Sequence, residues 1–89
     1  MNAIITVVGG DQVGIIARVS NYLAEHKVNI ADITQTVLSG NFVMMMMVSL
    51  EQSDITIDTL RTDLTEKMHS IGIEINIMSE KVFSTMHRI

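Results

Sequence analysis

The 89-residue sequence predicts one α+β domain, in which a four-stranded antiparallel sheet carries two helices on one face. Three observations predict this fold. Strand-like and helix-like segments follow in the order β-α-β-β-α-β, ahead of a short C-terminal helix or tail. A short turn joins the two middle strands, so they pair as an antiparallel hairpin. Right-handed helical connections then place the first and third strands in the centre of the sheet.

A pair of glycines separates the first strand from the first helix. Residues 2–8, NAIITVV, are rich in β-branched side chains and stop at Gly9-Gly10, which is typical of a strand that ends in a turn. From Gly14 to about Lys27, apolar residues recur at the spacing of a helix. This apolar stripe consists of Ile15, Ile16, Val19, Tyr22 and Leu23.

The following segment changes to a period of two, which is typical of strands. Residues 28–38 predict the second strand, residues 39–41 a turn, and residues 42–50 the third strand. Side chains of the second strand alternate between two faces, with Ile33, Gln35 and Val37 on one and Asp32, Thr34 and Thr36 on the other.

A second amphipathic helix and a fourth strand complete the pattern. Residues 57–71 follow a polar break and repeat apolar side chains at helical spacing, while Gly72 suits a left-handed C-terminal cap. Residues 73–79 alternate in the manner of a strand. The stripe of the second helix consists of Ile57, Leu60, Leu64, Met68 and Ile71.

Four consecutive methionines, Met44 to Met47, lie in the third strand. Because strand side chains alternate, Met44 and Met46 share one face of the sheet, and Met45 and Met47 share the other. This divergence disfavours a Cu(I) site, so packing is the favoured interpretation and no metal site is predicted. One pair is expected beneath the helices with Ala3, Ile5, Val7, Ile33, Val37 and the isoleucines of the fourth strand.

The other pair of methionines is expected near Ile4 and Val8 on the helix-free face, where an apolar patch needs a cover. The tail, about residues 79–89, offers one because its apolar side chains fall on one face of a short helix. It is expected to pack on the open sheet face of its own subunit or on a partner subunit. These tail side chains are Val82, Phe83, Met86 and Ile89.

Composition and charge disfavour several classes of protein. The chain is short for a monomer with its own core, so a homo-oligomer, at least a dimer, is expected. A net charge of −4 with scattered Lys and Arg opposes nucleic-acid binding. No apolar run approaches the roughly 20 residues that span a membrane, and no secretory leader is recognisable, so a cytoplasmic protein without membrane attachment is expected. The sequence has no Cys and suggests no cofactor.

The connection GGDQVGII, residues 9–16, carries the strongest functional signal. A glycine-rich passage from strand to helix presents backbone N–H groups and the positive end of the helix dipole to an anion. Asp11 has two interpretations. It is an N-cap or turn residue, which spacing alone favours, or a fixed carboxylate that pairs with an ammonium while nearby amides hold a carboxylate. The second interpretation predicts recognition of an α-amino acid.

Asn29 lies where the first helix returns to the second strand. It is interpreted either as a turn residue that tolerates a left-handed conformation, which is favoured, or as an amide that both donates to and accepts from a small polar ligand. The three histidines fall on or near separate elements, and no Ser has a nearby base. Neither a metal site nor a catalytic residue is therefore predicted.

The stretch ITVVGGDQVGIIARVSNYLAEHKVNIADITQTV resembles the signature of ACT domains, the small-molecule regulatory modules of amino-acid metabolism. The pieces that carry the resemblance are DQVGII, ARVSNYLAEHKVNI and DITQTV, and it extends over nearly the whole chain. The sequence most resembles the stand-alone single-domain ACT proteins of bacteria. It is similar also to the ACT segments of the glycine cleavage repressor.

The resemblance implies a ferredoxin-like fold that pairs with a second copy, with a ligand between the first loop of one subunit and the first-helix exit of the other. Many relatives have Pro where this chain has Val13, a departure that leaves an additional N–H in the loop. By position, the loop side would consist of Gly10, Asp11, Gln12, Val13 and Gly14, and the partner side of Asn29 and Ile30.

The sequence thus predicts a non-catalytic regulatory module that binds an amino acid or similar small metabolite at a homodimer interface. The alternative is an oligomerisation or protein-interaction module with no small-molecule ligand, which uses the open sheet face and tail. An acylphosphatase-type enzyme would share the strand order, but it needs a cationic cradle in the first loop. The nearest Arg, Arg18, lies inside the first helix.

Overall fold

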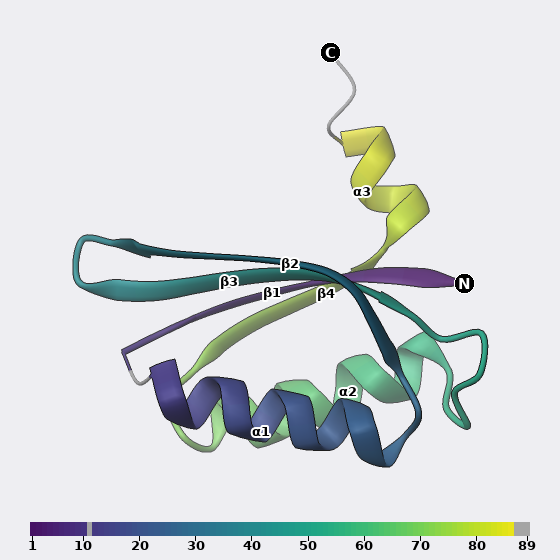
Figure 1. Ribbon diagram of the computed structural model, residues 1–89, viewed down its shortest axis with the longest axis horizontal. Coiled ribbons are helices and arrows are strands. Elements are labelled where there is room, and N and C mark those ends of the chain that lie inside the picture. The colour runs from purple at the N-terminus through teal and green to yellow at the C-terminus, as the bar shows by residue number, and fades with distance from the viewer. Residues whose placement is uncertain (11, 87–89) are drawn as a thin grey trace.

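The computed structural model describes residues 1–10 and 12–86 and has the predicted α+β architecture. Four strands form one antiparallel sheet in the order β2-β3-β1-β4, and α1 and α2 cover the same face of it (Figure 1). The elements are β1 (Asn2–Gly9), α1 (Gln12–Glu25), β2 (Asn29–Leu38), β3 (Asn41–Ser49), α2 (Ile57–His69), β4 (Glu74–Ser79) and α3 (Glu80–Met86). The predicted ferredoxin-like fold with a short C-terminal helix is confirmed.

The hydrophobic core lies between the sheet and the two long helices. β1 pairs with β3 on one side and β4 on the other, so that Ile5 lies opposite both Met46 and Ile77. All three side chains are buried beneath the helices. The helices contribute their predicted stripes, of which Ile15, Val19, Leu23, Leu60, Leu64 and Met68 are buried.

The methionine run divides between the two faces as predicted. Met44 and Met46 belong to the core, and Met46 is 1% exposed. Met45 lies opposite Thr6 and Thr34 on the helix-free face and is 38% exposed. Met47 lies on that same face, opposite Ile4 of β1. Adjacent thioethers of this run therefore point to opposite sides of the sheet.

Strand β2 is far more exposed than the sequence indicates. The predicted alternation is correct, because Ile33 lies opposite Met46 and Val37 opposite Phe42 on the helix side of the sheet. Their predicted burial is wrong, since Ile33 is 42% and Val37 66% exposed. β2 is the outer strand of the sheet, and every residue along it is exposed. The alternation along β2 determines which face of the sheet these side chains occupy, but it does not determine how far the helices extend over that strand.

Left-handed residues occur at two predicted turns. The β2–β3 hairpin turns through Ser39 and Gly40, which both have positive φ, as type I′ turns require. Gly72 follows α2 with a φ of 75°. There, the Ile73 N–H donates to the Met68 carbonyl at 2.9 Å and the Gly72 N–H donates to the His69 carbonyl at 3.1 Å. This pair of bonds closes the helix C-terminus in a Schellman arrangement, as the glycine predicted.

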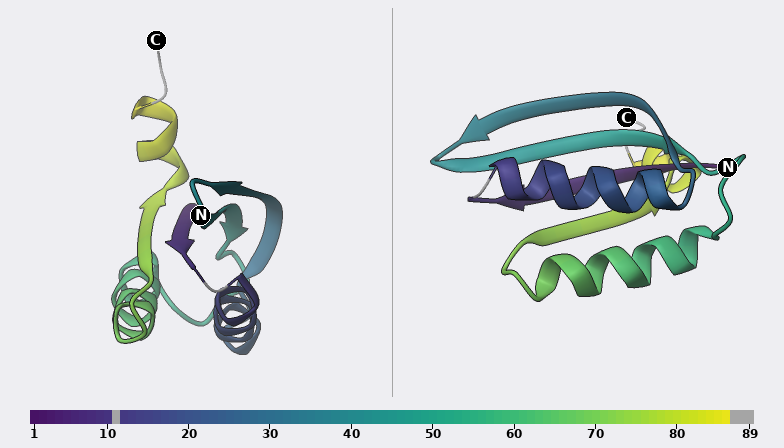
Figure 2. Two further views of the ribbon diagram at one scale, coloured as in Figure 1. Left: turned by 90° about the vertical axis from the view of Figure 1, so that its left-hand side faces the viewer. Right: turned by 60° about the horizontal axis from the view of Figure 1, so that its bottom comes forward.

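Helix α3 rises from the face of the sheet opposite α1 and α2 (Figure 2). Phe83 is half-buried and lines a small hollow with Ile4, Met45 and Met47. The tail thus covers part of the apolar patch of its own subunit, while Val82 is exposed. The Met86 side chain and Ile89, which were expected on the same helical face, lie outside the described residues. No helix in the described part of the chain has the length and apolar character needed to cross a membrane.

Gly9 is required by close packing between β1, α1 and Ile73, the residue that precedes β4. A Cβ atom at this position would lie 2.8 Å from Ile15 Cδ1 and 3.3 Å from Ile73 Cγ1. Because Ile15 is fully buried, its methyl group moves only if its neighbours move. Gly9→Ala is expected to lower the free energy of unfolding by on the order of 1 kcal/mol, measured by urea denaturation.

Gly10 provides the matched control, since a Cβ atom there would meet nothing within 4 Å. Gly10→Ala is expected to unfold at the wild-type urea concentration. Equal destabilisation by both substitutions would contradict the packing explanation for Gly9.

Candidate functional site

The loop side of the predicted site lies where β1 passes into α1. Gly10 is exposed in the connection, and Asp11 lies outside the described residues. The sequence placed the helix start at Gly14, but α1 begins at Gln12. Gln12, Val13 and Gly14 therefore form the first turn of the helix rather than a loop. The apolar stripe did not reveal this turn, because the first turn of a helix needs no apolar side chains. The exposed positions of Gln12 and Val13 leave this helix end accessible to a ligand.

The exit of α1 has the same hydrogen bonds as the exit of α2, with a lysine in the glycine position. The Val28 N–H donates to the Leu23 carbonyl at 2.8 Å, and the Lys27 N–H donates to the Ala24 carbonyl at 3.2 Å. Lys27 has a φ of 57°. The favoured interpretation of Asn29 as a left-handed turn residue is thus wrong, because Lys27 makes the turn and Asn29 begins β2.

A lysine in this conformation is costly. Left-handed backbone costs an L-residue about 1–2 kcal/mol, whereas the Gly72 counterpart after α2 escapes that cost. A cation near a helix C-terminus recovers only about 0.3–1 kcal/mol through the helix dipole. The stability of the fold therefore does not account for a lysine at this position.

The α1 exit opens onto a polar hollow of about 470 Å³, which contains the predicted Asn29. Both signs of charge are present, from Lys27 and Glu51, together with the carboxamides of Asn29 and Gln52. Within residues 1–10 and 12–86, neither the Lys27 ammonium nor the Glu51 carboxylate forms a salt bridge. The hollow is lined by Lys27, Val28, Asn29, Ser49, Glu51 and Gln52.

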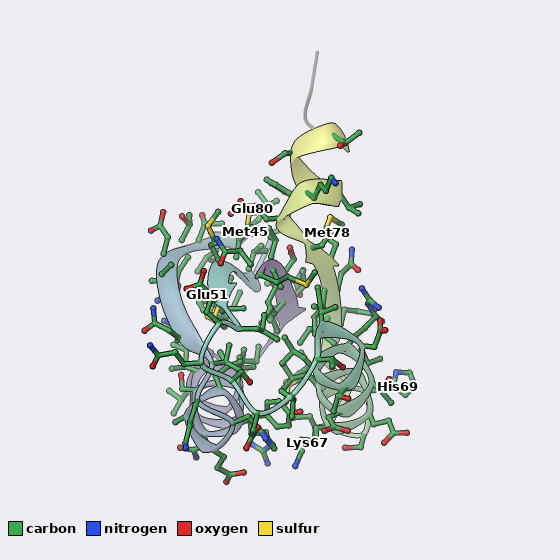
Figure 3. The ribbon with its side chains drawn as sticks, turned by 90° about the vertical axis from the view of Figure 1, so that its right-hand side faces the viewer. Met45, Glu51, Lys67, His69, Met78 and Glu80 are labelled. Atoms are coloured by element: carbon green, nitrogen blue, oxygen red, sulfur yellow. The ribbon has the colours of Figure 1, made fainter. Side chains whose placement is uncertain are left out.

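His26 fixes the segment after β3 to the α1 exit. Its backbone carbonyl accepts a hydrogen bond from Ser53 Oγ at 2.7 Å and another from the Asp54 N–H at 3.4 Å. Its Nδ1 lies 3.1 Å from Asp54 Oδ1. Figure 3 faces this end of the molecule and shows Glu51 beside the strands rather than beside α2. These contacts position Glu51 and Gln52 next to Lys27 and Asn29.

The loop side and the exit side lie at opposite ends of the sheet. Gly9 is paired with Phe42 at the hairpin end, whereas Asn29 is paired with Ser49, which also pairs with Asn2 at the other end. Helix α1 runs the length of the sheet between them (Figure 1). The seven residue steps from Asn2 to Gly9 span roughly 23 Å, so one chain does not bring the two predicted sides together.

The two edges of the sheet differ in accessibility. At the β4 edge, Arg61 Nε donates to the Ile77 carbonyl at 3.1 Å, and Arg61 is held by Asp58 at 2.9 Å. Strand β2 forms the other edge and exposes Ile30, Ile33, Val37 and Leu38. An accessible apolar edge strand is a template for pairing with another chain.

A third hollow, of about 350 Å³, lies between α1 and α2 and includes Tyr22 and Lys67. The Tyr22 hydroxyl donates to Asp63 at 2.7 Å, and the Lys67 ammonium lies 5.8 Å from the Tyr22 ring centre. Burial, followed by the Asp63 carboxylate, raises the pKa of Tyr22 far above its usual value, so the hydroxyl stays a donor. These contacts connect the two helices to each other.

The fold described above is that of an ACT domain, and the sequence model of the ACT domain matches residues 2–78. The chain belongs to this family, which confirms the resemblance seen in its sequence. It is 47% identical to a UPF0237 protein of Clostridium acetobutylicum over all 89 residues, covering the whole of both chains. A UPF0237 protein of Methanopyrus kandleri is 41% identical, with 98% of this chain and 97% of the relative covered.

Solved structures agree with this assignment. An ACT domain protein from Streptococcus pneumoniae superposes with a TM-score of 0.80 and 43% identity, covering 93% of each chain. A putative glycine cleavage system transcriptional repressor has the same fold, with a TM-score of 0.74 and 23% identity, over 86% of this chain and 44% of the other. The chain is therefore a member of a family of regulatory modules.

Proposed function

We propose that this protein is a non-catalytic regulatory module of the cytoplasm that binds an α-amino acid or similar small metabolite between two copies of the chain. The copies pair side by side through β2. The observation that carries this proposal is the separation of the loop side from the exit side along one accessible, apolar edge strand. A site divided in this way is complete only in an oligomer.

Pairing of β2 with β2 about a twofold axis is antiparallel, so the start of one strand lies near the end of the other. Asn29 and Ile30 begin β2, and Leu38 ends it close to the β1–α1 connection. The twofold therefore carries the exit of one copy towards the loop of its partner. It also covers the exposed apolar side chains of the edge.

The loop supplies the chemistry for an amino-acid head group. Backbone N–H groups at the start of α1 are suited to a carboxylate, and the Asp11 carboxylate is suited to an ammonium. The packing of the chain does not require glycine at Gly10, where a side chain would enter open space. A glycine there is useful when a ligand approaches the backbone closely.

Calorimetric titration and thermal-shift measurement against the common amino acids test the proposal. At least one of them is expected to bind and to raise the melting temperature at millimolar concentration. Gly10→Ala is expected to weaken that binding by about tenfold or more while leaving the stability of the free protein unchanged. Stabilisation by none of the amino acids would contradict the proposal.

A second candidate function is oligomer assembly, or docking of a protein partner, through the helix-free face and the tail, with no small-molecule ligand. It is favoured by the partly exposed Met45 and the hollow of about 130 Å³ beside Phe83. This candidate predicts that Met45→Glu or Phe83→Glu breaks assembly in light scattering, whereas Asp11→Ala leaves it intact. The opposite outcome, intact assembly in the two glutamate variants, would eliminate it.

A further inference from the structure

We infer that Lys27 and Glu51 recognise the side chain of the ligand, and that this side chain ends in a carboxamide. The inference rests on the proposed function and specifies its ligand. With the head group at the loop of one subunit, the ligand side chain reaches the polar hollow at the α1 exit of the other. The composition of that hollow then determines which amino acid fits.

The first reason is the conformation of Lys27. It occupies the left-handed position that Gly72 occupies after α2, with the same two closing hydrogen bonds. Glycine is the residue that this position ordinarily takes. Lys27 adopts this conformation at a cost in backbone free energy. It lines a polar hollow and forms no salt bridge to any described residue, so its ammonium is suited to binding a ligand.

The second reason is the fixed position of Glu51. Ser53 and Asp54 hold the segment after β3 against the His26 carbonyl, and the Glu51 N–H donates to Ser49 Oγ at 3.4 Å. Glu51 therefore lines the same hollow as Lys27, so that a carboxylate and an ammonium are both available there. One is an obligatory donor and the other an obligatory acceptor.

These two groups together favour a neutral polar side chain. A charged side chain would be attracted by one of these two groups and repelled by the other, and an aliphatic side chain would form a hydrogen bond with neither. A carboxamide satisfies both, because its carbonyl accepts from Lys27 and its NH₂ donates to Glu51. The amides of Asn29 and Gln52 line the same hollow and form the same kind of hydrogen bond.

The test compares glutamine and asparagine with glutamate, aspartate, leucine and serine by calorimetric titration of the full chain. Glutamine or asparagine is expected to bind the wild-type protein at least about tenfold more tightly than the other four. Lys27→Gly and Glu51→Ala are each expected to weaken that binding by about tenfold or more. Lys81→Ala, which removes an exposed lysine of α3, serves as the control and is expected to bind as wild type.

Thermal unfolding separates ligand binding from folding. Lys27→Gly replaces a left-handed lysine by glycine, so its melting temperature is expected to equal or exceed that of the wild type. Preference for leucine or an acidic amino acid, or wild-type affinity in both hollow variants, would overturn the carboxamide assignment alone. Absence of binding by every amino acid would overturn the proposed function as well.

Discussion

Met46→Ala is expected to lower the free energy of unfolding by about 2–5 kcal/mol, measured by urea denaturation. Met46 is 1% exposed and lies between Ile5 and Ile33 of the neighbouring strands, beneath the helices. Removing its side chain loses the free energy of apolar burial and leaves a cavity that a packed core fills only in part. For a domain of this size, this is a large share of the total stability.

Met45→Ala is the matched control, one residue along the same strand. Met45 is 38% exposed on the opposite face, so its truncation is expected to cost clearly less, about 1 kcal/mol or below. Equal losses for the two variants would show that the methionines are not divided between a core face and an open face.

Ile33→Lys is expected to dissociate the β2-paired dimer, weakening it by about a hundredfold or more. The proposed twofold would place two copies of each β2 side chain in one interface, so each substitution would lose apolar burial twice and add a pair of like charges. Light scattering over a range of protein concentrations measures the effect. Since the proposed ligand site needs both copies, loss of the dimer is expected to weaken amino-acid binding as well.

Ile71→Lys is the control for this substitution. Ile71 is 41% exposed, close to the 42% of Ile33, but it follows α2 rather than lying on the β2 edge. It is expected to leave the dimer intact. Dissociation by both variants would indicate a general effect of added charge, and dissociation by neither would contradict pairing through β2.

The fold could be predicted because its determinants are local. The alternation along β3 assigned Met44 and Met46 to the core, and Gly72 marked the end of α2 through the conformation that glycine permits. Ile33 and Val37 show the limit of this reasoning. Their face follows from a period of two, but their burial depends on how far α1 extends over the outer strand, which is a tertiary property.

The candidate site could be predicted only in part. Asn29 lies in a polar hollow, as its position suggested, but the turn conformation belongs to Lys27. A lysine at a helix exit gives no signal in a hydropathy pattern. Comparison with Gly72 reveals it only once the hydrogen bonds of both exits are known. Glu51 and Gln52 were missed because contacts from His26, distant in sequence, bring their segment to the site.

A subunit-mixing experiment tests most directly whether the site is shared between two chains. Asp11→Ala removes the carboxylate of the loop side and Asn29→Ala the amide of the exit side, so each homodimer is expected to lose amino-acid binding. After the two variants are unfolded together and refolded at equal concentration, half of the dimers are mixed, and each mixed dimer contains one intact site.

Calorimetric titration of the mixture should therefore recover about one quarter of the wild-type binding capacity, at wild-type affinity. Recovery of no binding, in a mixture shown by mass spectrometry to contain mixed dimers, would contradict a site assembled from the β1–α1 connection of one chain and the α1 exit of its partner.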